Sequence, residues 1–188
     1  MSYYDIDAIL TDAEKVPCKF ELDVPELGYL DNDPSNPLKT GTTVALPLWL
    51  AELLALASRA PSSSEEDAKS FVSLELPRSL SSEVLSALKA DPRAVPLRDQ
   101  SQNFYGLGTR MLDLFEEREI CAIVRKTFVT RAADIALHAR KAGATDDVPS
   151  SIGGEFLRGL EEWERKLFKS AHDGTKGTKD WMENVKKH

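Results

Sequence analysis

The segment from Asn103 to Phe115 reads NFYGLGTRMLDLF and predicts an α-helix with one apolar stripe. Each glycine inside a helix costs about 1 kcal/mol relative to alanine, so this helix is weak by itself. Glycine also lets a second backbone come close. We therefore expect the helix to pack against another helix, in this chain or in a partner; a kinked core helix is the alternative. The stripe consists of residues at offsets of three and four, namely Phe104, Leu107, Gly108, Met111, Leu112 and Phe115.

The chain around this helix is helical in its periodicity from residue 71 onward, after a possible short strand at 71–76. Ser81 is a suitable N-cap for a helix that stops before Asp91, and Gly143 is a suitable C-terminal stop for a later helix. Residues 143–154 read as a loop. The expected helices are 81–90, 99–117, 119–142, 155–171 and a short last helix bearing Trp181, Met182 and Val185.

The first 60 residues predict a small β-rich module that ends in a connecting helix. A short helix is expected at 4–10, and strands at 16–22, 28–30 and 39–46. Pro47 opens a helix to about residue 59 that is apolar on more than one face, which favours burial on several sides. The composition of 61–70 is that of a linker, and 71–188 forms the helical domain.

Charge is distributed unevenly along the 188 residues, whose formal net charge is −7. Residues 1–70 hold thirteen acidic and five basic residues, whereas the remainder is nearly neutral. Neither part has the basic surplus that phosphate binding requires, so direct nucleic-acid contact is expected to be weak or absent. An acidic module joined to a neutral one favours protein binding.

The compartment is expected to be intracellular and reducing. Cys18 and Cys121 lie outside any Cys-x-x-Cys pair, and we expect free thiols, although a disulfide between them stays open. The acidic N-terminus has no signal-peptide pattern. The apolar stretch 44–57 is shorter than the roughly 20 residues a membrane span needs, so no membrane contact is expected.

No residue pattern indicates catalysis, a metal or a cofactor. The three histidines lack partners at metal-ligand spacing, and Gly106-Leu107-Gly108 lacks the third glycine of a dinucleotide loop. Acidic residues near the N-terminus, from Asp5 to Glu14, fit a solvated face better than a calcium loop. Lysines near the C-terminus alternate with acids, so a charged surface is favoured over a phosphate site.

Several blocks, in order, resemble the third Psf-type subunit of GINS, a four-protein complex of eukaryotic DNA replication. Each block alone is weakly specific, but their order and spacing cover nearly the whole chain. The blocks are Tyr3-Tyr4-Asp5-Ile6-Asp7, Lys15-Val16-Pro17-Cys18, Leu27-Gly28-Tyr29-Leu30, Leu46-Pro47-Leu48-Trp49-Leu50-Ala51, Ala90-Asp91-Pro92, Phe104-Tyr105-Gly106-Leu107-Gly108 and Glu164-Arg165-Lys166-Leu167-Phe168.

The resemblance implies a mainly α protein with a small β-rich B domain followed by a helical-bundle A domain. It implies a nuclear, non-enzymatic subunit that assembles with three other GINS subunits. It further implies that the assembly joins the MCM helicase ring and its cell-division-cycle cofactor at the replication fork and helps to dock the leading-strand DNA polymerase. A small ligand-binding or enzymatic domain with an unrecognised site is the alternative.

The residues expected at a subunit interface lie in the two apolar helices. In the helix at 47–59 the candidates are Trp49 and Leu50. In the glycine-bearing helix the candidates pack where two subunits meet, or directly beneath that contact. The predicted set is Trp49, Leu50, Phe104, Tyr105, Leu107, Gly108, Met111 and Leu112.

Overall fold

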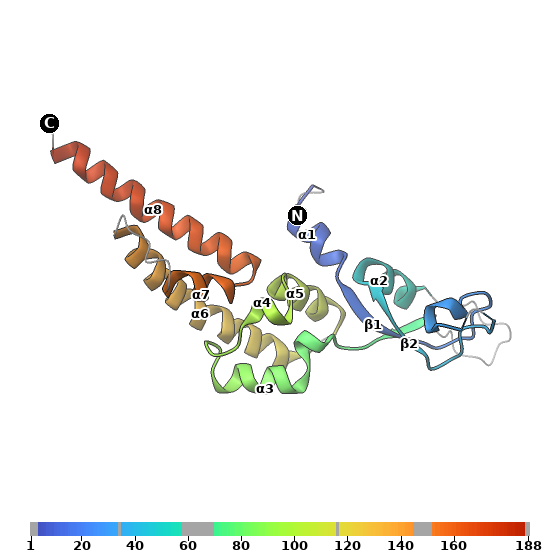
Figure 1. Cartoon of the computed structure of the whole chain (residues 1–188). Helices are drawn as coiled ribbons and strands as arrows, with labels where there is room; N and C mark the ends of the chain where they lie inside the picture. The colour runs from blue at the N-terminus through green and yellow to red at the C-terminus, as the bar shows by residue number, and fades with distance from the viewer. Residues whose placement is uncertain (1–3, 34, 58–69, 116, 145–151, 187–188) are drawn as a thin grey trace. The chain divides into compact units, whose positions relative to one another are not determined.

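The chain divides at Pro77 into two compact units, Met1–Pro77 and Arg78–His188. The structure is a computed structural model, and it describes residues 4–33, 35–57, 70–115, 117–144 and 152–186. Figure 1 shows the helices and strands of each unit. The prediction of a mainly α chain with a small N-terminal β module is confirmed.

Unit 1 is built on a three-stranded antiparallel sheet in the order β2-β1-β3. The central strand β1 (Lys15–Phe20) pairs with β2 (Thr43–Pro47) and with β3 (Val72–Leu74). Alternate residues of β1 point to one face, so that Val16, Cys18 and Phe20 are buried there. Two helices complete the unit, α1 (Ile6–Asp12) and α2 (Leu48–Leu56).

Two local predictions for unit 1 need revision. Residues Gly28–Asp31 form a 3-10 helix, η1, and not a strand, because the carbonyls of Asp33 and Asn36 fold back over Gly28. Pro47 is the last residue of β2, so α2 begins one residue later and ends at Leu56. Residues 61–69 of the predicted linker lie outside the described residues.

Unit 2 is a bundle organised around the long helix α6 (Arg118–Ala144). Helix α8 (Glu162–Lys186) packs along it, and α3 (Ser82–Ala90) and α5 (Phe104–Leu114) contact it elsewhere. Phe156 of α7 (Ile152–Arg158) stacks on His138 of α6, with ring centroids 4.1 Å apart. The short elements η2 (Arg78–Leu80) and α4 (Leu97–Gln100) lead into the bundle.

Helix boundaries in unit 2 follow the predictions at some ends and depart from them at others. Ser81 caps α3 as predicted, through its side-chain oxygen and the Val84 N–H. The predicted helix 99–117 is interrupted by extended backbone at Ser101, which separates α4 from α5. Helix α6 runs one residue past Gly143, so that glycine lies in its last turn.

The predicted helix 155–171 is two helices, separated at Gly159-Leu160-Glu161. The second of them, α8, continues without a break through Trp181 to Lys186, where a separate short helix was expected. No helix in the described ranges is long and apolar enough to cross a membrane. Cys18 is a buried free thiol and Cys121 an exposed one.

Candidate subunit interface

The predicted interface residues of α5 lie in the core of unit 2 and not on its surface. Phe104 and Met111 are 1% exposed, and Tyr105 and Leu107 are 2% exposed. Leu112 is half-buried. Direct contact of these four side chains with a partner stays a prediction, although they are buried within the chain by itself. A position beneath a contact remains a prediction.

Gly108 does not accommodate a close helix backbone within the chain. A Cβ added there meets only the two methyl carbons of Val124 on α6, each at 3.9 Å, which is ordinary van der Waals distance. No contact among the described residues therefore requires glycine at position 108. The close approach of another backbone at Gly108, expected from the sequence, is absent within the part of the chain described.

Replacing Gly108 by alanine is expected to stabilise the chain by up to about 1 kcal/mol. The new methyl fits against Val124, and alanine loses less backbone entropy than glycine in a helix. The midpoint of urea unfolding measures this. A destabilised Gly108→Ala chain would contradict the geometry, whereas a stabilised chain that no longer assembles would place a partner's backbone at this residue.

Tyr105 is the centre of an aromatic cluster that joins three helices of unit 2. Its ring meets Phe104 and Phe128 edge to face, at centroid distances of 5.5 and 5.2 Å. It also stacks on Trp163 of α8 at 6.3 Å. Because Phe128 and Trp163 are 38% and 39% exposed, the cluster reaches from the core to the surface. The cluster fixes α5, α6 and α8 relative to one another.

A buried ion pair lies directly below this cluster. The Arg131 side chain on α6 donates from Nε and Nη2 to the two carboxylate oxygens of Glu164 on α8, at 2.6 and 2.8 Å. It donates further to the carbonyls of Pro92, Val95 and Gly159, at 3.0, 2.9 and 3.3 Å. All five guanidinium N–H groups therefore have an acceptor.

Arg131 and the neighbouring Tyr105 have shifted pKa values. Tyr105 donates its hydroxyl to Glu164 at 3.0 Å, and burial together with the Glu164 charge raises the tyrosine pKa well above its ordinary range. The pKa of Arg131 is raised because the hydrogen bonds and charge of Glu164 outweigh the opposing effect of burial. Both groups keep one protonation state at physiological pH.

Glu161 closes the network at the start of α8. Its carboxylate accepts the Glu164 N–H at 3.0 Å, while the Glu164 carboxylate accepts the Glu161 N–H at 3.3 Å, which is the reciprocal pattern of a capping box. Its second oxygen is buried without a hydrogen-bond partner. Burial, opposed by the backbone N–H groups and reinforced by the Glu164 charge, raises the Glu161 pKa from 4.5 to about 7.

This raised pKa predicts that the chain loses stability as the pH rises. The folded state binds the Glu161 proton more tightly than the unfolded state does, so the contribution is complete below about pH 4.5 and lost through pH 7. We expect the urea midpoint to fall as the pH rises from about 4.5 to about 7. Glu161→Gln keeps an acceptor for the Glu164 N–H without the charge, and it should flatten this profile. An unchanged profile in that variant would show that another group carries the dependence.

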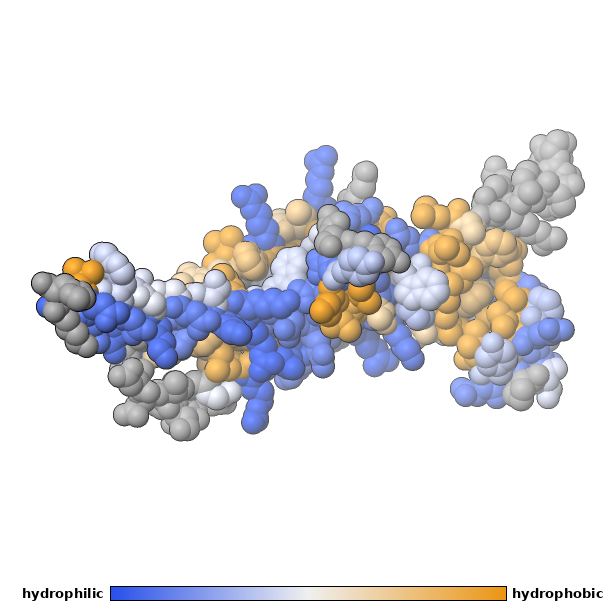
Figure 2. Space-filling view, turned by 90° about the horizontal axis from the view of Figure 1, so that it is seen from above, coloured by the Kyte–Doolittle hydropathy of each residue, from blue (hydrophilic) through white to orange (hydrophobic). Residues whose placement is uncertain are grey.

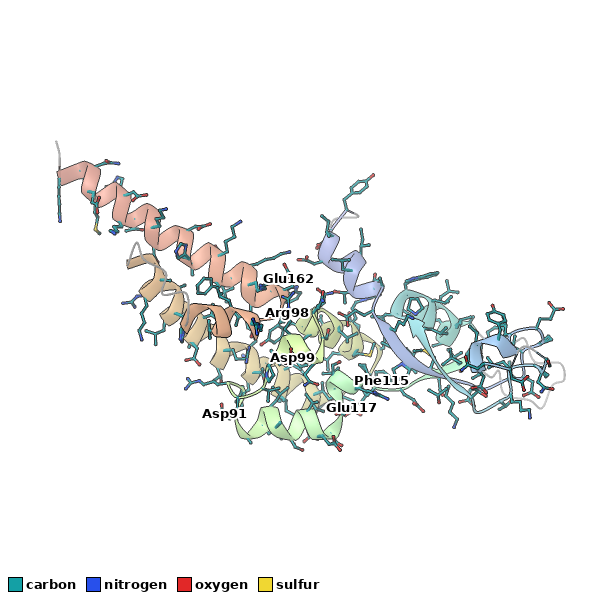
Figure 3. The ribbon with its side chains drawn as sticks, viewed as in Figure 1. Asp91, Arg98, Asp99, Phe115, Glu117 and Glu162 are labelled. Atoms are coloured by element: carbon teal, nitrogen blue, oxygen red, sulfur yellow. The ribbon has the colours of Figure 1, made fainter. Side chains whose placement is uncertain are left out.

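Sequence reasoning missed this network for an identifiable reason. Glu161 and Glu164 have capping-box spacing before an apolar run, and that signal was available. Arg131 gave no signal, because three of its five acceptors are backbone carbonyls from two segments distant in the sequence. Figure 3 shows the start of α8, marked by Glu162, beside the α4 segment marked by Arg98 and Asp99. The Glu162 N–H donates there to the Gln102 carbonyl at 3.1 Å.

The outer half of α8 exposes large apolar side chains. Trp181, Met182 and Val185 are 64%, 52% and 54% exposed. Figure 1 shows this end of α8 extending past the end of α6. Gly174 and Gly177 lie in the same half, and a Cβ at either one meets nothing within 4 Å. A helix surface of this composition suits contact with another protein.

The helices of unit 1 also expose apolar side chains. Trp49 is 54% exposed, so the predicted burial of α2 on several sides is wrong within the chain. Only Leu48 and Ala51 of α2 are buried, and Leu50 is half-buried. The expected interface residue Trp49 is therefore at the surface, where a partner can reach it.

Comparisons with known proteins cover both units. Residues 4–56 match the PSF3 N-terminal domain, and residues 79–183 match the GINS complex protein helical bundle domain. The chain is 63% identical over 187 residues to the DNA replication complex GINS protein PSF3 of Gibberella zeae, covering 100% of this chain and 99% of that one. It is 56% identical over 217 residues to the Neurospora crassa psf3 protein, over the full length of both.

A more distant relative also matches over nearly its whole length. The Saccharomyces cerevisiae DNA replication complex GINS protein PSF3 is 36% identical over 194 residues, which cover 97% of this chain and 98% of that protein. The two domain matches occur in the order of the two units, and the relatives match from end to end. The chain belongs to the PSF3 family of DNA replication complex GINS proteins.

Proposed function

We propose that this chain is a non-enzymatic subunit of a four-protein GINS complex in the nucleus. In this proposal the complex joins the MCM helicase ring and its cell-division-cycle cofactor to form the active helicase for initiation and elongation of replication. It also helps to dock the leading-strand DNA polymerase. The observation that carries the proposal is the full-length match, at 56% and 63% identity, to relatives named DNA replication complex GINS proteins.

The exposed apolar helices support a role in assembly. An obligate interface resembles a domain core cut in half, and it presents apolar side chains that are exposed when the subunit is alone. Trp181 and Met182 of α8 and Trp49 of α2 have this character, each being more than half exposed. Aromatic and methionine side chains are enriched at such interfaces.

The buried charged residues of unit 2 have structural roles, which supports a non-enzymatic subunit. Arg131 and Glu164 are 7% and 1% exposed, and Arg131 is bound to three backbone carbonyls. A catalytic group must reach its substrate, and these side chains are enclosed by the bundle. The described residues contain no group of three potential metal ligands.

Affinity purification from nuclear extract tests the proposal. A tagged copy of the chain should recover three further GINS subunits in equal amounts, together with MCM subunits during DNA synthesis. Depletion of the chain should arrest replication, and the wild-type chain should restore it. Recovery of the chain alone as a stable monomer, with replication unaffected by its depletion, would support the ligand-binding alternative.

A further inference from the structure

Helices α1 and α2 of unit 1 together form an exposed apolar surface, which we call the α1/α2 patch. The two helices adjoin, and the Leu48 N–H at the start of α2 donates to the Glu14 carbonyl after α1 at 2.8 Å. In Figure 2 the apolar colour gathers over these two helices. Each side chain of the patch is between 51% and 76% exposed, and they are Ile6, Ile9, Leu10, Trp49, Leu53 and Leu56.

The fold of unit 1 does not account for this surface. Helix α1 has seven residues and buries only Thr11, whereas its isoleucines and leucine face outward. A helix of that length is marginal in water, so its stability must come from packing of its apolar side. Helix α2 already buries Leu48 and Ala51 against its own unit, on the side away from the patch. Six large apolar side chains exposed together are unusual for a protein that works alone.

The charges around the patch restrict what covers it. Neither α1 nor α2 contains a basic residue, and Lys15, at the start of β1, is the one base beside them in the described residues. The acidic residues in or beside the two helices are Asp5, Asp7, Asp12, Glu14 and Glu52, so acids outnumber bases five to one. Phosphate groups of nucleic acids and of anionic lipids carry the same sign and are repelled. A protein segment with apolar residues in its middle and lysine or arginine at its ends matches the apolar side chains of the patch and the acidic residues around it.

We propose that the α1/α2 patch is the seat of an amphipathic segment from another subunit of the same complex, with an apolar stripe flanked by basic residues. An apolar helix face lying on an apolar surface is a common form of such recognition. This inference rests on the proposed function, because the occupant belongs to the assembly. Permanent occupancy explains why so much apolar surface is tolerated.

Replacement of Leu53 by aspartate tests the apolar part. Leu53 is 57% exposed, so the variant chain should fold, with an unchanged circular dichroism spectrum and melting temperature. Co-expressed with the three other subunits, of which one is tagged, Leu53→Asp should be recovered at about one-tenth of the wild-type yield or less, because a buried, unpaired charge opposes association. Leu56→Asp, at 76% exposure, is a second variant with the same expectation.

The control lies in the same unit but outside the patch. Tyr29 of η1 is 58% exposed, so Tyr29→Asp introduces the same charge at the same exposure. It should assemble as the wild-type chain does. Equal yields for Leu53→Asp, Leu56→Asp and the control would overturn the proposal. If the wild-type chain itself fails to join the three subunits, the proposed function fails first, so the two failures are distinguishable.

A photo-cross-linker at Leu53 and a salt titration test the occupant's chemistry. Benzoylphenylalanine at this position in the assembled complex should cross-link to one subunit, at a segment flanked by lysine or arginine. Glu52→Gln, which removes one acid beside the patch, should make assembly less sensitive to sodium chloride. A cross-link to an acidic segment, or assembly that is equally salt-sensitive in both chains, would contradict the proposed charge complementarity.

Discussion

Replacing Arg131 by methionine is expected to lower the free energy of unfolding by about 3–5 kcal/mol. The variant keeps an unbranched apolar stem, but it leaves the Glu164 carboxylate, 1% exposed, without its cation. The carbonyls of Pro92, Val95 and Gly159 lose their donor as well. Removing one partner of a buried pair is costly because the remaining charge cannot be solvated.

Urea unfolding of the full chain measures this effect, and Arg93 provides a matched control. Arg93 pairs with the carboxylate of Asp134 on α6 at 2.8 Å. These two side chains are 57% and 28% exposed, so this ion pair is not buried. A solvent-exposed pair contributes about 0–1 kcal/mol, so Arg93→Met should be nearly neutral. Equal effects of the two substitutions would show that the Arg131 network is not the anchor of the bundle.

Replacing Gly28 by alanine is expected to destabilise unit 1 by about 3 kcal/mol, the upper end of the range for overpacking. A Cβ at this position would lie 1.8 Å from the Asn36 carbonyl oxygen and 2.2 Å from that of Asp33. Both obstacles are backbone atoms, so no side-chain rotation relieves the overlap. The segment that follows η1 would have to move away, and the hydrogen bond from the Asp33 N–H to the Gly28 carbonyl would break.

Gly174→Ala is the control for this substitution. Gly174 lies inside α8, and a Cβ there meets nothing within 4 Å, so alanine should stabilise the helix by up to about 1 kcal/mol. Differential scanning calorimetry of both variants separates the two effects. A Gly28→Ala chain that melts at the wild-type temperature would show that the loop over η1 is not packed as described.

Much of the fold was predictable because apolar periodicity and caps are local properties. Ile120, Ile123 and Val124 have helical spacing and are buried in α6, and Ser81 caps α3 as predicted. The strand prediction for residues 28–30 is wrong because their 3-10 conformation depends on the close approach of the Asn36 backbone to Gly28. The break between α7 and α8 was missed because it depends on the network centred on Arg131. That network joins residues far apart in the sequence, so no local pattern shows it.

The candidate interface was predictable only in part, because amphipathicity does not say what covers an apolar face. The stripe of α5 indicated packing, but the packing partner of Phe104 and Tyr105 is the rest of their own bundle. The all-round apolar character of α2 suggested burial on several sides, yet Trp49 and Leu53 are exposed in the chain by itself. The sequence identifies apolar helix faces that must be covered. Only the fold shows which of these faces are covered by the chain itself and which stay exposed.

Native mass spectrometry of the chain co-expressed with three other GINS subunits tests the central claim most directly. The account predicts one species that contains a single copy of each of the four proteins, with little free chain at physiological salt. It also predicts that the side chains of α1, α2 and the outer half of α8 are protected from surface labelling in this species, compared with the isolated chain. A chain that remains monomeric beside a stable three-protein assembly would contradict the account.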